Sequence, residues 1–171
     1  MTVLETSPRK PKPEKAGLCA IAVLGLGNLL RTDDGGGIHA IRRLQGDSRL
    51  PEEIELIEGG TMGLSLLPPI QGITHLLVLD AVDAGVGAGT LLRFANRDID
   101  RLPLAKSVHL LGFADLLDSL RLLGQAPAEV ILIGVQPGST DWGVTLSPAV
   151  EVTLGQLVEA AFFQIAAWLE V

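Results

Sequence analysis

The segment from residue 21 to residue 44 constrains the fold more than any other stretch of the chain. It starts as a buried apolar run at 21–24, breaks at a glycine-containing turn at 25–28, and then passes two adjacent carboxylates, Asp33 and Asp34. Apolar residues resume at helical spacing, at Ile38, Ile41 and Leu44. Strand, turn, acidic loop and helix follow in the order of the first β-α unit of an α/β domain.

Strand and helix patterns alternate along the rest of the chain. Apolar runs predict further strands at 53–57, 75–80, 89–94 and 129–135, and Glu58-Gly59-Gly60-Thr61 predicts a second glycine turn after the first of these. Helical spacing predicts helices at 36–45, 62–67 (halted by two prolines), 109–123 and 149–169. This alternation predicts a single three-layer α/β domain over residues 16–171, with a mostly parallel twisted sheet of about five strands and helices on both faces. Residues 1–15, rich in charge and proline, are expected to form a disordered tail.

Charge and cysteine content exclude several classes of function. The net charge is −7, and residues 50–171 carry 5 basic and 15 acidic side chains, which disfavours nucleic acid as a partner. Cys19 is the single cysteine, so there is no internal disulfide or cysteine-based zinc site, as expected for a protein of the reducing cytoplasm. No uninterrupted apolar run reaches the roughly 20 residues of a membrane span, so we expect no membrane partner.

Three side chains are candidates for chemistry, because ligands of open α/β sheets bind at the carboxyl ends of the strands. Asp34 follows the first strand, Asp80 ends the central strand, and His109 begins a helix after a long loop. Two carboxylates and an imidazole suit a divalent ion such as nickel, zinc or manganese. Structural roles compete with this interpretation: Asp80 as the cap of a turn, Asp33 with Asp34 as a pair at a helix N-terminus, and His109 as a helix cap.

The glycine turn also suggests a dinucleotide-binding loop. However, the third glycine position of that fingerprint is Leu30 in this chain. A pyrophosphate would also meet the carboxylates of Asp33 and Asp34, which have the wrong sign. A nucleotide-binding, Rossmann-like enzyme is therefore the weaker alternative.

Taken together, ordered segments between residues 20 and 168 resemble the hydrogenase maturation endopeptidases. The matching segments are Gly25-Leu26-Gly27-Asn28-Leu29-Leu30 with Asp33-Asp34-Gly35, Gly59-Gly60-Thr61 with Gly63, Leu79-Asp80-Ala81-Val82-Asp83, the helix start at His109, and Leu132-Ile133-Gly134-Val135-Gln136-Pro137. The resemblance implies a cytoplasmic peptidase that removes the C-terminal extension of the [NiFe]-hydrogenase large-subunit precursor.

The resemblance also implies roles for individual residues. The family's nickel-recognising and catalytic positions fall on Asp34, Asp80 and His109, and the Gly59-Gly60-Thr61 segment would contact the substrate peptide. The nickel would arrive on the precursor, although another divalent cation could occupy the site in vitro, and the free protein would be a monomer. The family commonly has glutamate at the position of Asp34. A non-catalytic checkpoint or chaperone that binds the nickel-loaded precursor is the alternative function.

Overall fold

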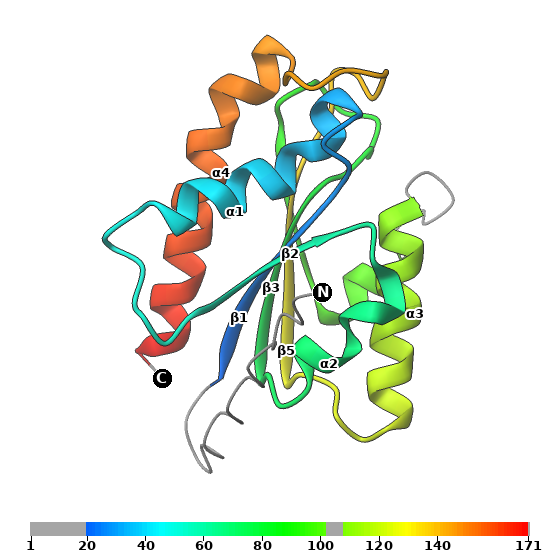
Figure 1. Cartoon of the computed structure of the whole chain (residues 1–171), viewed down its shortest axis with the longest axis vertical. Helices are drawn as coiled ribbons and strands as arrows, with labels where there is room; N and C mark the ends of the chain where they lie inside the picture. The colour runs from blue at the N-terminus through cyan, green and yellow to red at the C-terminus, as the bar shows by residue number, and fades with distance from the viewer. Residues whose placement is uncertain (1–19, 102–107, 171) are drawn as a thin grey trace, which may run out of the picture.

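A five-stranded sheet runs through the part of the chain that the computed structural model describes, residues 20–101 and 108–170. The strand order is β2-β1-β3-β5-β4 (Figure 1). The strands are β1 (Ile21–Leu26), β2 (Glu55–Gly60), β3 (His75–Ala81), β4 (Leu91–Ala95) and β5 (Glu129–Val135). Strands β2, β1, β3 and β5 are parallel, and β4 pairs antiparallel with β5 at one edge. The predicted mostly parallel sheet of about five strands is confirmed.

The connections diverge between β1 and β3. After β1 the chain crosses to β2 at one edge, and after β3 it moves to β4 and β5 at the other. The carboxyl ends of β1 and β3 therefore flank a topological switch point, which is where open α/β sheets form their ligand crevice.

Helices cover both faces of the sheet. They are α1 (Gly36–Gln45), α2 (Leu67–Ile70), α3 (Val108–Leu122) and α4 (Pro148–Leu169), with short 3-10 segments η1 (Thr32–Gly35), η2 (Gly63–Leu66) and η3 (Asn96–Arg101). Helices α1 and α4 pack on one face, and α2 and α3 pack on the other (Figure 1).

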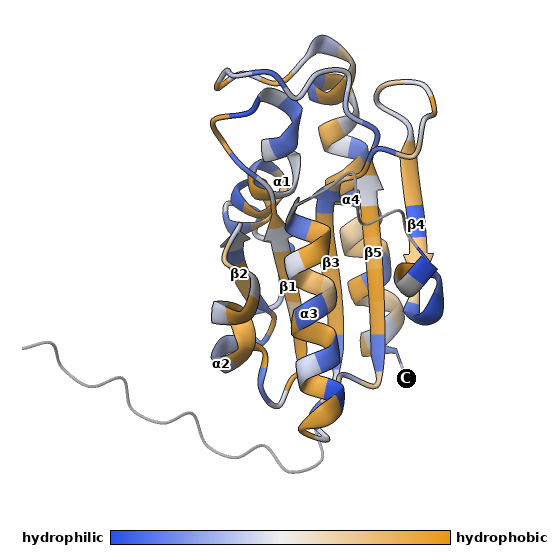
Figure 2. Ribbon diagram, turned by 90° about the vertical axis from the view of Figure 1, so that its right-hand side faces the viewer, coloured by the Kyte–Doolittle hydropathy of each residue, from blue (hydrophilic) through white to orange (hydrophobic). Residues whose placement is uncertain are grey.

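Each face of the sheet has its own apolar core. Alternate residues of β1 separate the two: Val23 packs with α1 and α4, whereas Leu24 packs with α2 and α3. The three inner strands, β1, β3 and β5, are mostly apolar (Figure 2), because a strand inside a parallel sheet is buried on both faces.

Several expected boundaries shift in the structure. Strand β2 starts at Glu55 rather than at residue 53 and continues through Gly59 and Gly60, which were expected to turn. Pro68 and Pro69 do not halt a helix but occupy the first turn of α2, where a missing N–H costs no hydrogen bond. The expected tail at 1–15 lies outside the described residues.

Helix α4 is long and apolar enough, by length and composition alone, to cross a membrane. Its buried side chains, among them Leu154, Leu157, Val158 and Ile165, belong instead to the core that it forms with α1 and the sheet. The high mean hydropathy of α4 is thus that of a helix covering a sheet.

The start of α1 lies against the strand ends. A Cβ on Gly37 would stand 2.1 Å from the carbonyl oxygen of Leu79 and 2.4 Å from that of Leu26. Only a glycine permits this approach, which brings the loop between β1 and α1 over the switch point.

Candidate active site

Asp34 lies on η1, within the loop that joins β1 to α1. Its N–H donates to the carbonyl of Arg31 at 2.9 Å, and its carbonyl accepts the N–H of Asn28 at 3.1 Å. The Asp34 side chain is 16% exposed, enough to reach a ligand in the crevice. The predicted position of this carboxylate, beyond the carboxyl end of β1, is the one observed.

His109 comes from the other face of the sheet, from the first turn of α3, and contacts Asp34. The distance from His109 Nε2 to Asp34 Oδ2 is 2.7 Å, and the imidazole side chain is only 8% exposed. Burial lowers the pKa of His109, but the hydrogen bond that Asp34 accepts and the negative charges of Asp34 and Asp80 outweigh it, so that the pKa is raised. The contact with Asp34 thus favours the protonated form of the imidazole.

Asp80 occupies the carboxyl end of β3 and is completely buried. Its Oδ1 accepts the N–H of Ala81 at 2.8 Å. Burial raises the pKa of Asp80 to about 7, the nearby charge of His109 opposes this rise, and the charge of Asp34 adds to it. A carboxyl group with such a pKa exchanges a proton near neutral pH, as a general acid or base must.

Two buried polar atoms of this group have no hydrogen-bond partner among the described residues, Asp80 Oδ2 and His109 Nδ1. Buried polar atoms are nearly always satisfied, so two orphaned ones at the switch point indicate a place for a ligand. Within the described ranges, no three carboxylate, imidazole or thiol side chains are arranged to enclose a metal ion as the structure stands. Because His109 Nε2 is bonded to Asp34, a metal would have to replace that hydrogen bond.

The segment Gly59-Gly60-Thr61, predicted to contact substrate, lines a hollow of about 280 Å³ beside the glycine turn. The Gly27 N–H donates to the carbonyl of Gly60 at 3.1 Å, and the adjacent Asn28 N–H bonds to Asp34. The same short turn thus joins the wall of the hollow to the loop that carries Asp34.

Sequence reasoning missed two buried polar side chains that hold the loops around this group. Asp33, expected to be a neighbour of Asp34 in loop and cap structure, accepts four hydrogen bonds from residues 138–147. Gln136, which follows β5, accepts the N–H of Ala84 at 2.8 Å and donates to Asp83 Oδ1 at 3.1 Å. Gln136 directly follows the carboxyl end of β5, a strand that is buried on both faces. This position is the one sequence signal that could have identified Gln136 as a residue near the site.

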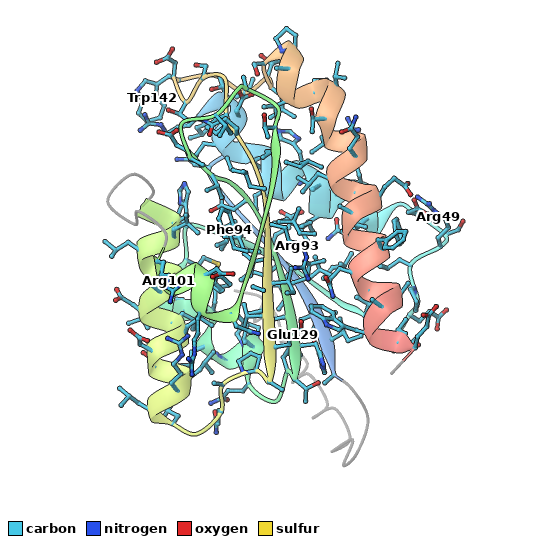
Figure 3. All side chains as sticks on the ribbon, turned by 180° about the vertical axis from the view of Figure 1, so that it is seen from behind. Arg49, Arg93, Phe94, Arg101, Glu129 and Trp142 are labelled. Carbon is cyan, nitrogen blue, oxygen red and sulfur yellow. The ribbon has the colours of Figure 1, made fainter. Side chains whose placement is uncertain are left out.

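The candidate site lies at the end of the sheet where the parallel strands finish. Trp142, on the loop after β5, lies at the end of the molecule where the strands finish, and Glu129, which begins β5, lies at the other end (Figure 3). Asp34 follows the carboxyl end of β1, Asp80 lies at the carboxyl end of β3, and His109 bonds to Asp34, so all three share the end of the sheet where the strands finish. No other described histidine joins them, since His39 lies on α1 and His75 begins β3.

Comparison with known proteins gives a consistent family. A family model described as hydrogenase maturation protease matches residues 38–164. The chain belongs to the hydrogenase maturation protease family. It is 37% identical over 160 residues to the hydrogenase expression/formation protein HupD of Rhodobacter capsulatus, covering 92% of this chain and 74% of that protein. It is 36% identical to the hydrogenase 2 maturation protease of Escherichia coli, covering 87% and 90%.

Solved structures agree with the sequence relatives. The hydrogenase maturating endopeptidase HybD from E. coli superposes with a TM-score of 0.82 at 32% identity, covering 86% of this chain and 92% of that one. The HybD protein of Thermococcus kodakarensis superposes with a TM-score of 0.70 at 27% identity. This hydrogenase maturation protease is therefore a hydrolase acting on peptide bonds, and the nucleotide-binding alternative falls away.

Proposed function

We propose that the chain removes the C-terminal extension of the [NiFe]-hydrogenase large-subunit precursor, and that it recognises the nickel carried by that substrate through Asp34, Asp80 and His109. One observation carries the proposal. In a member of this protease family, Asp34 and His109 touch at the switch point, beside the unpartnered Oδ2 of the buried Asp80.

The chemistry of these three groups suits a metal presented by another molecule. A buried carboxylate whose second oxygen has no donor is costly, and a cation offsets that cost. Nickel would take the place of the proton that Asp34 and His109 now share, because imidazole binds a metal only when that nitrogen is deprotonated. The site would be complete only when the substrate brings its metal, so that cleavage depends on a finished nickel centre.

Peptide hydrolysis adds water across the scissile amide, giving a carboxylate and an amine. The water is activated by a carboxylate acting as general base or by the metal acting as Lewis acid. Asp80 meets the first requirement, since its pKa of about 7 keeps a useful fraction in each protonation state. The segment Gly59-Gly60-Thr61 would hold the substrate peptide alongside. We further propose that the enzyme acts in the cytoplasm as a monomer.

The decisive experiment follows cleavage of nickel-loaded precursor by mass spectrometry. We expect Asp34→Asn, Asp80→Asn and His109→Ala to keep the fold and to slow processing by at least about 10²-fold, the usual contribution of one acid-base group. Asp115→Asn, an equal charge change at an exposed position of α3, is the matched control and should process normally.

Two outcomes would contradict the proposal. Full cleavage by all three variants would remove the assigned residues from the site. Cleavage of nickel-free precursor at the wild-type rate would remove nickel recognition. A non-catalytic checkpoint would instead bind the precursor without shortening it, and the same spectra would reveal that.

A further inference from the structure

The carboxylate of Asp33 is the most fully bonded polar side chain near the site, although no chemistry is assigned to it. It is completely buried. Oδ2 accepts the N–H of Gly138 at 2.7 Å, the N–H of Ser139 at 3.0 Å and the hydroxyl of Ser147 at 2.7 Å. Oδ1 accepts the N–H of Ser147 at 2.6 Å. All four partners come from the loop that joins β5 to α4, here called the 137–147 loop.

Ser147 illustrates how strongly the site is organised around Asp33. Serine at the position before a helix usually caps it by bonding the next free N–H groups. At the start of α4, the Ser147 side chain does not cap the helix. Its hydroxyl donates a hydrogen bond to Asp33 instead. Burial raises the pKa of Asp33, but the bonds from Ser147, Ser139 and Gly138 outweigh it and hold the pKa below its usual value.

The residues before Asp33 reinforce the same contact. The Thr32 N–H donates to the carbonyl of Gly143 at 2.9 Å, and its hydroxyl donates to the carbonyl of Ser139 at 2.6 Å. Arg31 Nε donates to the carbonyl of Thr140 at 3.0 Å. Thr32 has a φ of +38°, a conformation that a β-branched residue adopts only when its surroundings impose it.

Asp34 is thus held between two supports. On one side, its carbonyl accepts the N–H of Asn28 from the glycine turn at 3.1 Å. On the other side, the preceding residue is fixed to the 137–147 loop by four hydrogen bonds. With its backbone fixed at both ends, the Asp34 side chain has only its own torsions left to reach His109 Nε2, 2.7 Å away.

We propose that Asp33 is a positioning residue: its carboxylate, bound by the 137–147 loop, sets where Asp34 stands relative to His109 and so whether the pair can meet the substrate's metal. This inference rests on the proposed function of Asp34 and His109 and adds a residue that touches neither substrate nor metal. A purely structural Asp33 would affect stability alone.

The chemistry of the contact selects the variants. Every partner of Asp33 is a donor in this geometry, so Asp33→Asn can satisfy Oδ2 with its amide oxygen, but its NH₂ then faces the N–H of Ser147. Ser147→Ala removes one hydrogen bond and leaves the carboxylate, whereas Ser147→Thr keeps the hydroxyl. Trp168→Phe is the matched control for stability, because it removes the 2.7 Å bond from Trp168 to Glu129 at the far end of the sheet.

Three readouts separate positioning from stability: thermal unfolding followed by circular dichroism, kcat and KM for nickel-loaded precursor, and imidazole ¹H–¹⁵N NMR spectra of the free protein. The chain has three histidines, so His109→Ala assigns the resonance of His109. In Asp33→Asn we expect the His109 signals to shift and kcat to fall about 10²-fold, as misplacement by about 1 Å produces. KM should rise by a smaller factor than kcat falls, because Asp34 and His109 are proposed to recognise the substrate's nickel as well as to align it for cleavage.

The remaining variants should fall in order. Ser147→Ala should show a smaller shift and a smaller loss of kcat, and Ser147→Thr should resemble the wild type. Trp168→Phe should lose thermal stability while kcat and the His109 signals stay unchanged. Folded Asp33→Asn and Ser147→Ala with wild-type His109 signals and kcat would overturn the inference, and if Asp33→Asn does not fold, Ser147→Ala decides. If the wild-type protein cleaves nothing, the proposed function fails, while the NMR spectra still test the positioning role.

Discussion

Asp33 and Asp34 are adjacent in the chain, yet their carboxylates have opposite surroundings. The strand-end rule was enough to place Asp34, Asp80 and His109 at one end of the sheet, because it needs only the order of strands and loops. It could not assign Asp33, whose partners lie 105 to 114 residues further along the chain. A buried carboxylate that only accepts hydrogen bonds has no local pattern, since its donors come from a loop whose path depends on the whole fold.

At the same residue scale, the buried Asp80 should lower the free energy of unfolding at and above neutral pH. Its folded-state pKa of about 7 lies above the usual value of 3.8, so folding favours the protonated form. The contribution of Asp80 to the free energy of unfolding is therefore most favourable below about pH 4 and is lost as the pH rises towards 7. We expect Asp80→Asn to raise the free energy of unfolding at pH 8 by up to about 4 kcal/mol, at 1.36 kcal/mol per pKa unit, while it slows processing by at least about 10²-fold.

Urea unfolding at two pH values tests this prediction. At pH 3.5 the variant and the wild type should be nearly equal in stability, because Asp80 is then protonated in the folded state and mostly protonated in the unfolded state. A gain of equal size at both pH values would mean that packing, rather than ionisation, distinguishes the asparagine.

At the scale of secondary-structure elements, glycines were the residues that sequence reasoning interpreted least well. Gly59 and Gly60 suggested a turn, but the structure keeps them in β2, where the register with β1 shifts and Leu26 pairs with Gly60. A Cβ on Gly59 would stand 2.5 Å from Leu24 Cδ1. Glycine is therefore needed at this position so that Leu24 of the neighbouring strand can pack against the backbone. Local sequence propensity does not predict such a contact between strands.

The approach of α1 to the strand ends gives a prediction for that element. Gly37→Ala would put a methyl group against the backbone carbonyls of Leu79 and Leu26, and backbone cannot move aside as a side chain can. We expect the free energy of unfolding to fall by about 3 kcal/mol, the upper end of the usual cost of overpacking. Processing should also weaken, because a shift of α1 would move the loop that carries Asp34.

Gly46→Ala, at the C-cap of the same helix, is the control. A Cβ there meets only the carbonyl of Arg43, at 3.8 Å, and the φ of −90° and ψ of −2° need no glycine. Its stability should stay constant or rise by up to about 1 kcal/mol. Chemical denaturation of both variants measures the difference, and equal stabilities would show that α1 can shift away from the sheet at little cost.

At the scale of the whole molecule, the alternation of strands and helices was enough to predict a three-layer α/β domain. It did not predict the strand order, nor that β4 runs antiparallel at the edge. Whether a strand runs parallel or antiparallel depends on the strand beside which it packs. Strand β4 pairs with β5, which comes later in the chain, so local sequence does not predict its direction.

The two cores share one sheet, and this arrangement predicts how the molecule unfolds. Leu157 belongs to the core under α1 and α4, and Phe113 to the core under α3, and both are at most 1% exposed. Because β1, β3 and β5 contribute side chains to both cores, neither core can lose its packing while the sheet persists.

We expect Leu157→Ala and Phe113→Ala each to lower the free energy of unfolding by about 2–5 kcal/mol and to keep a single transition. In a Trp142→Phe background, fluorescence of the buried Trp168 reports the first core, and far-UV circular dichroism reports all helices. If Phe113→Ala separated the two unfolding curves, the faces of the sheet would be independent units, and the coupling through the shared strands would be disproved.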